Sequence, residues 1–149
     1  MNVNGLVMQF FRLPKPLIHK NKISADELKK LFPYRCKVFT ADSSFKLYEL
    51  KSVAELLKLN YFAKMKYIAN DRDCDDYEKV MTGLMTPLLP NGAFGKCWMD
   101  VLHTDGSLNY RHAVNVFVDE HKCVWLVEPQ ANKIFSYNTK KYKPYLVVI

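Results

Sequence analysis

The sequence predicts a single α+β domain in which helices come first and an antiparallel sheet follows. Helical periodicity and helix-capping patterns lie before residue 86, whereas strand-like segments separated by polar turns fill the rest of the chain. A length of 149 residues and a hydrophobic content of 49% suit one domain with a substantial core. We therefore expect residues 1–149 to form one domain.

The first half of the chain contains two capping-box patterns, each of which marks the start of a helix. The pattern at residues 24–27 predicts a helix that ends at Phe32, and the pattern at residues 52–55 predicts a helix that ends near Leu59. Ahead of both helices, residues 5–13 are a candidate strand, and residues 36–40 between the two helices are another.

A third helix is expected over residues 74–85, where apolar side chains recur at helical spacing. Asp73 is the expected N-cap of this helix, so Cys74 falls in its first turn. Pro87 ends the helix because proline lacks the backbone N–H that a helix interior needs.

The second half of the chain is typical of an antiparallel sheet, with polar turns between alternating segments. We expect the large aromatic side chains of Trp98, Tyr110 and Trp125 to belong to the core rather than to a ligand surface. Five strands are expected, at residues 96–103, 108–118, 123–127, 133–137 and 145–149.

Charge and cysteine content narrow the class of function. The formal net charge is +7, but the basic residues are dispersed and no nucleic-acid-binding motif accompanies them, so a nucleic acid is not the expected partner. The four cysteines show no C-x-x-C spacing and no paired histidines, which argues against zinc. Reduced thiols, together with the lack of a signal-peptide pattern or an apolar run of membrane-spanning length, predict a cytoplasmic protein without a membrane segment.

Three residues have the types and order of a cysteine-nucleophile site. Cys74 at a helix start would meet unpaired backbone N–H groups, which favour a thiolate and can hold an oxyanion. His112 on a strand supplies a base, and Glu128 at the end of the next strand supplies the acceptor that orients it. Each residue also has a purely structural interpretation, as a capping-region thiol, an exposed strand histidine and a polar strand end.

Four aspartates surround the candidate nucleophile, and their negative charge opposes thiolate formation. Either the carboxylates point away from the thiol or a cation such as Ca²⁺ neutralises them. The spacing is not that of an EF-hand loop, because no glycine follows Asp75 and Thr82 stands where a bidentate glutamate is needed. A solvated, helix-capping cluster is the alternative. The four aspartates are Asp71, Asp73, Asp75 and Asp76.

Strand register provides a geometric test of the site. If Val118 and Cys123 pair across a four-residue turn, residue 113 lies opposite residue 128, and His112 and Glu128 point to opposite faces of the sheet. The catalytic interpretation therefore predicts a one-residue offset in this hairpin, such as a three-residue loop or a bulge would produce.

The motifs around these three residues resemble the papain-like cysteine-protease domain of the Marasmius oreades agglutinin family, whose small relatives occur in bacteriophage and bacterial genomes. The resemblance covers roughly residues 45–137 and implies a papain-like α+β fold, with the nucleophile helix packed on an antiparallel sheet. The lectin domain of the agglutinin has no counterpart in this chain, so the resemblance does not imply glycan binding. The matching motifs are Asp73-Cys74-Asp75, His112-Ala113-Val114-Asn115 and Glu128-Pro129-Gln130.

The resemblance implies a cysteine hydrolase that cleaves amide bonds of a peptide or protein, with Cys74, His112 and Glu128 as the catalytic trio. It also implies calcium, for which Asp75 and Asp76 are the candidate ligands. The glutamine that donates to the oxyanion in the family has no equivalent, so Asn70 or backbone N–H groups would substitute. Two alternatives stay open: a small phage-type protein that binds a host factor through this fold, and a transglutaminase-like acyl transferase.

Overall fold

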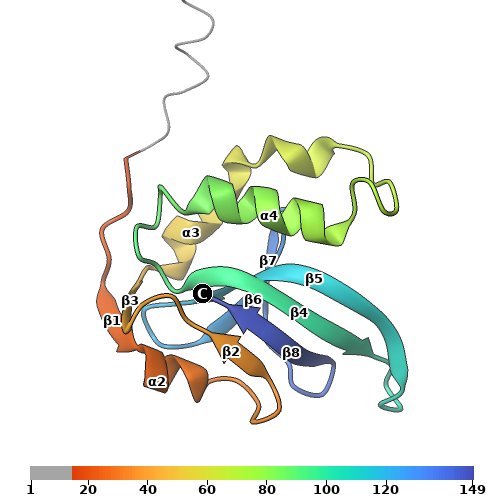
Figure 1. Cartoon of the computed structure of the whole chain (residues 1–149). Coiled ribbons are helices and arrows are strands. Elements are labelled where there is room, and N and C mark those ends of the chain that lie inside the picture. The colour runs from red at the N-terminus through yellow and green to blue at the C-terminus, as the bar shows by residue number, and fades with distance from the viewer. Residues whose placement is uncertain (1–14) are drawn as a thin grey trace, which may run out of the picture.

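The computed structural model describes residues 15–149 and contains two β-sheets and three α-helices (Figure 1). The candidate strand at residues 5–13 lies outside the described residues. The helices are α2 (Ala25–Lys29), α3 (Leu50–Leu56) and α4 (Cys74–Met85), with 3-10 turns η1 (Leu57–Leu59) and η2 (Tyr61–Lys64) after α3. The strands are β1 (Asn21–Ser24), β2 (Lys37–Phe39), β3 (Ser44–Leu47), β4 (Phe94–Leu102), β5 (Leu108–Val118), β6 (Val124–Glu128), β7 (Lys133–Ser136) and β8 (Tyr142–Val148).

The two capping-box patterns behave differently. At the start of α2, the Ser24 hydroxyl accepts a hydrogen bond from the Glu27 N–H at 3.2 Å, and the Glu27 carboxylate accepts one from the Ser24 N–H at 3.1 Å. This box is confirmed, although α2 ends before Phe32. The second is wrong as a helix start, because α3 begins at Leu50 and the Ser52 hydroxyl instead donates to the Glu49 carboxylate.

The larger sheet has six strands in the order β2-β8-β4-β5-β6-β7, and β1 pairs with β3 in a separate two-stranded sheet. Strands β4 to β8 confirm the five strands expected in the second half, with boundaries shifted by a few residues. Strand β2 runs parallel to β8 and extends the sheet at one edge. Strands β1 and β3 were not predicted.

Helices cover both faces of the six-stranded sheet (Figure 1). Helices α3 and α4 lie over one face, where Val53, Met81 and Met85 pack with Phe117 and Val127 in one core cluster. Helix α2 and the β1–β3 sheet meet the other face in a second cluster, which is completed by strand residues of β4, β5 and β8. The first of these clusters holds α4 against the sheet, which positions the residue at its N-terminus.

The predicted fold class is wrong in the proportion of helix to strand and in the order of these elements along the chain. Eight strands in two sheets dominate the described residues, and β1, β2 and β3 alternate with the short helices α2 and α3 instead of following them. The architecture is therefore mostly β, and it corrects the expected papain-like α+β class of helices followed by a sheet. Among residues 15–149, none of the helices is long and apolar enough to cross a membrane.

Candidate nucleophilic thiol site

Cys74 is the first residue of α4, where the sequence pattern places it. Asp73 precedes it in an extended conformation, and its N–H donates to the Asp76 carboxylate at 3.3 Å, which fixes the first turn. Tyr77 and Met81 on the buried face hold the helix against the sheet. The Cys74 thiol is free and half-buried at this anchored helix end.

The β5–β6 hairpin carries the other two candidate residues in the register that the site requires. Val118 lies opposite Val124 and Asn115 opposite Val127, so the connection contains five residues and residue 114 falls opposite residue 128. His112 and Glu128 are therefore diagonal neighbours on one face of the sheet. The His112 Nε2 and Glu128 Oε2 atoms lie 2.6 Å apart. The predicted one-residue offset is confirmed.

Asp119 organises the five-residue connection that produces this register. Its side chain is almost fully buried, and one carboxylate oxygen accepts hydrogen bonds from the His121 and Cys123 N–H groups, each at 2.9 Å. The other oxygen accepts a bond of 2.7 Å from the Trp125 indole N–H. Because the Asp119 carboxylate satisfies two backbone N–H groups of the loop, it specifies a connection of five residues.

The electrostatics of His112 depend on both of its partners. Burial lowers the pKa of His112, but hydrogen bonding with Cys74 and with Glu128, together with their negative charge, outweighs burial and raises this pKa to about 9. The Glu128 Oε1 atom accepts from the Gln130 N–H at 3.1 Å, which orients the carboxylate. Because Nε2 of His112 faces Glu128, Nδ1 is the ring nitrogen left for the thiol.

The thiol opens onto a surface depression of about 230 Å³. Trp98 and Tyr145 line it with side chains that are 37% and 38% exposed. The prediction that large aromatic side chains belong to the core is therefore wrong for Trp98, and it is also wrong for Tyr110, which is exposed. The Trp125 side chain is half-buried, and its indole N–H donates to Asp119. The residues that line the depression are Cys74, Asp75, Trp98, Arg111, His112, Ala113 and Tyr145.

Asn70 is not placed at this depression. It lies in the tight turn before α4 with a φ of 60°, and its own N–H donates to the Asp73 carboxylate at 3.2 Å. No sequence pattern identified Tyr145 as a site residue, although it lines the depression. Its position depends on how β8 pairs with β4, which no local pattern in the sequence shows.

The aspartates near the nucleophile form a cluster in which three carboxylates come within 4.8 Å of one another. Lys79 neutralises two of them, with its Nζ 2.5 Å from Asp75 and 3.3 Å from Asp76. A hydrogen bond with Asp75 raises the pKa of Asp73, as expected for crowded carboxylates. With one oxygen from each residue, the cluster brings three ligand atoms together, fewer than the six to eight that calcium takes, and two of its carboxylates are already paired with Lys79. The residues therefore do not fit a calcium site as they stand.

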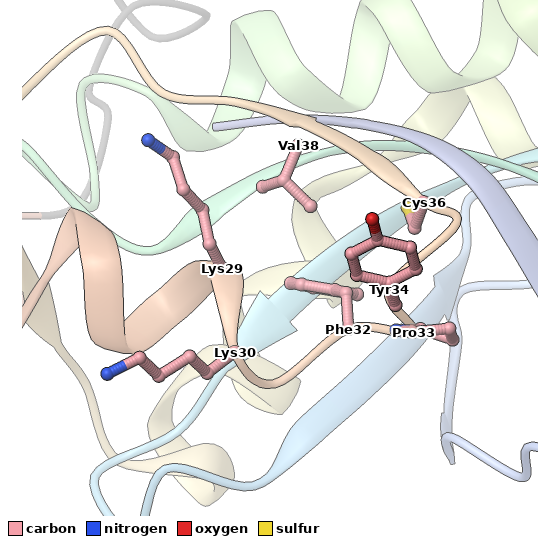
Figure 2. Close-up of a pocket in the computed structure, with 7 residues that line it drawn as sticks. All are labelled: Lys29, Lys30, Phe32, Pro33, Tyr34, Cys36 and Val38. Carbon is pink, nitrogen blue, oxygen red and sulfur yellow. The ribbon is translucent and has the colours of Figure 1, made fainter.

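The other cysteines lie in different environments. Burial raises the pKa of Cys36 to about 11 and also raises that of Cys97, whereas Cys123 is exposed. Cys36 borders a separate cavity of about 480 Å³ (Figure 2). That cavity has lysines and apolar side chains on its walls but no histidine or carboxylate to serve as a base, so Cys36 is an internal reference for an unactivated thiol. The cavity is lined by Lys29, Lys30, Phe32, Pro33, Tyr34, Cys36 and Val38.

Comparison with known proteins shows similarity of fold. No family model matches the chain, and no curated protein matches it. A solved structure described as "PSL1a-E64 complex" aligns with a TM-score of 0.65 and 18% identity, over 88% of this chain and 51% of that one. A Polyporus squamosus lectin bound to the glycan epitope Neu5Aca2-6Galb1-4GlcNAc aligns with a TM-score of 0.65 and 17% identity, over 88% of this chain and 50% of that one. The chain spans about half the length of these structures.

These similarities correct the functional expectation. One of the structures that share the fold is described as a lectin with a bound glycan. The prediction of an amide-cleaving papain-like peptidase is therefore overturned, and the alternative of a phage-type protein that binds a host factor gains no support from these structures. What is shown of the resemblance to the agglutinin family is a fold shared with the Polyporus squamosus lectin. A relationship to the protease domain of that family is not shown.

Proposed function

We propose that Cys74, His112 and Glu128 form a nucleophilic thiol site that takes up an acyl group from an ester or thioester donor. The single observation that carries this proposal is the 2.6 Å contact between His112 and Glu128 beside a thiol at a helix start. Contact with Cys74 also contributes to the raised pKa of His112. A thiol, an imidazole and a carboxylate in this order are the components of an activated nucleophile.

The proposed reaction begins when the Cys74 thiolate attacks the carbonyl carbon of the donor. A C–S bond forms, and the carbonyl electron pair moves to oxygen. When this intermediate collapses, the bond to the leaving alcohol or thiol breaks, and the His112 imidazolium supplies its proton. The acyl group remains on Cys74 as a thioester. The acceptor then attacks the thioester carbonyl carbon while neutral His112 takes its proton and Glu128 holds the imidazole in place. The C–S bond breaks, the acyl group leaves on the acceptor, and the Cys74 thiolate and the His112 imidazolium are restored.

Esters and thioesters are the donor class that suits these groups. Their leaving groups depart more readily than an amine, so they need less stabilisation of the intermediate than an amide does. The first N–H groups of α4 lack intrahelical partners and carry the positive end of the helix dipole, which favours an oxyanion near Cys74. A free thiol persists only where thiols stay reduced, so we also propose an intracellular location.

We expect brief exposure to p-nitrophenyl acetate at neutral pH to acetylate Cys74 well before any other cysteine. Intact-protein and peptide mass spectrometry would locate the acetyl group, and Cys36 would serve as the reference thiol in the same molecule. Iodoacetamide, and E64, an epoxide that alkylates thiols, would test the thiol without a carbonyl step. In the Cys74→Ser variant all three modifications should disappear from this position. Equal modification of Cys74 and Cys36 by all three reagents would refute the proposal.

Binding of a glycan in the same depression is the second candidate. The observation that favours it is the pairing of two exposed aromatic rings, Trp98 and Tyr145, with Arg111 around one hollow of a positively charged protein. Aromatic faces can pack on sugar rings, and a guanidinium can pair with the carboxylate of a glycan such as the one bound by the similar lectin. A bound glycan would cover Cys74, so the free trisaccharide should slow acetylation in the same assay if this candidate is right.

A further inference from the structure

The nucleophilic site proposed above lacks an assigned side-chain donor for the oxyanion. Asn70, the residue expected for this task, does not line the depression next to Cys74. Attack on a carbonyl by Cys74 would nevertheless place negative charge on an oxygen close to the thiol. A preorganised donor at that point is usually a large contributor to rate in acyl transfer.

Tyr145 is brought to this depression by an irregularity in the sheet. Along the β4–β8 pairing, Trp98 lies opposite Leu146 but Met99 lies opposite Pro144, so Tyr145 is an extra residue without a partner in β4. Such a bulge redirects a side chain from the regular alternation of the strand. The Tyr145 side chain lines the same hollow as Cys74 and His112.

The environment of Tyr145 keeps its hydroxyl protonated. Burial raises the pKa of Tyr145, and although Arg111 works in the opposite direction, the negative charges of Asp100 and Cys74 raise it further. The influence of Cys74 on this hydroxyl is consistent with their shared depression. A neutral phenol is a hydrogen-bond donor, and tyrosine hydroxyls serve as oxyanion donors in acyl-transfer sites.

We propose that Tyr145 is a catalytic residue that donates its hydroxyl hydrogen bond to the oxyanion formed when Cys74 attacks a carbonyl group. The inference rests on the proposed function, because it assigns a role within the same reaction. The bulge places the phenol, and the N–H groups at the start of α4 supply the other donors. Trp98 lines the same depression, so an acyl group on Cys74 would lie near two aromatic rings.

Two reagents separate this role from a structural one. Acetylation by p-nitrophenyl acetate passes through an oxyanion, whereas alkylation by iodoacetamide displaces iodide at a saturated carbon and does not. In the Tyr145→Phe variant we expect acetylation of Cys74 to slow by about 10²-fold, while alkylation proceeds at the wild-type rate. Tyr61→Phe is the matched control, since Tyr61 is an exposed tyrosine in η2 that does not line the depression. Its acetylation rate should stay unchanged.

Each other result overturns the inference in a recognisable way. Wild-type acetylation in Tyr145→Phe would show that the hydroxyl does not reach the oxyanion. Equal slowing of acetylation and alkylation would show that Tyr145 positions the thiol instead of stabilising the intermediate. If Cys74 of the wild-type protein reacts with neither reagent faster than Cys36 does, the proposed nucleophilic site itself is refuted. A result confined to the Tyr145→Phe variant refutes only the role of Tyr145, so the two failures can be distinguished.

Discussion

Replacement of His112 by alanine should slow the acetylation of Cys74 by about 10³-fold at neutral pH, because the thiol loses its base and its imidazolium partner. In the wild type, the raised pKa of His112, about 9, keeps the imidazole protonated at neutral pH. In the variant, only hydroxide can form the thiolate, so the rate should climb with pH and approach that of the wild type in alkaline solution. The rate of acetylation measured from pH 6 to pH 10 checks both features.

His103→Ala is the matched control for this prediction. His103 is exposed at the β4–β5 turn, and only its backbone takes part in the turn hydrogen bonds. Its loss should leave the rate unchanged. His112→Asn tests whether a polar side chain of similar size preserves the fold, which urea unfolding would verify. If Cys74 of a folded His112 variant is still acetylated at the wild-type rate, the imidazole does not activate the thiol.

The Asp119→Ala variant should lower the free energy of unfolding by about 2–4 kcal/mol, because three part-buried donors lose a charged acceptor that is itself buried. Two of these donors are backbone N–H groups of the five-residue connection, and the third is the Trp125 indole. Urea denaturation should show a lower midpoint with an unchanged slope, as expected when stability rather than compactness changes. Asp119→Asn should be intermediate, since an amide keeps one acceptor oxygen but presents a donor to Trp125.

Asp105→Ala provides the comparison. Asp105 also accepts from the backbone of a hairpin turn, with Ser107 as its partner at 2.9 Å, but it is exposed. Water can replace its bonds, so its loss should change stability by well under about 1 kcal/mol. If Asp105→Ala and Asp119→Ala prove equally mild, burial of the Asp119 carboxylate does not determine the stability of the hairpin.

Local patterns along the chain predicted a large part of the structure. Helical periodicity and the Asp73 position gave α4 with Cys74 in its first turn, and alternation gave strands β4 to β8. The requirement that His112 and Glu128 share a face predicted the register offset that β5 and β6 show. These features depend on residues close in sequence, or on one hairpin.

Features that depend on distant segments could not be predicted. The strand β2 was expected at residues 36–40, but its parallel pairing with β8 was not, because that pairing joins distant segments. The strands β1 and β3 are too short for a strand pattern to show in the sequence, and they were not predicted. Trp98 and Tyr145 show the same limit at the site, because the bulge between β4 and β8 exists only in the paired strands. Trp98 is expected in the core because it is an aromatic residue in a strand, but its side chain lines the surface depression instead.

The interaction among Cys74, His112 and Glu128 is tested most directly by an NMR titration of the His112 imidazole. The signal can be assigned among the four histidines by its loss in His112→Asn. The account predicts a pKa of about 9 for His112 in the wild type and a lower pKa in both Cys74→Ser and Glu128→Gln, since each change removes a negative partner. Titration of wild-type His112 in the ordinary range near ~6.5, or a pKa that does not respond to the loss of Cys74, would contradict the central claim.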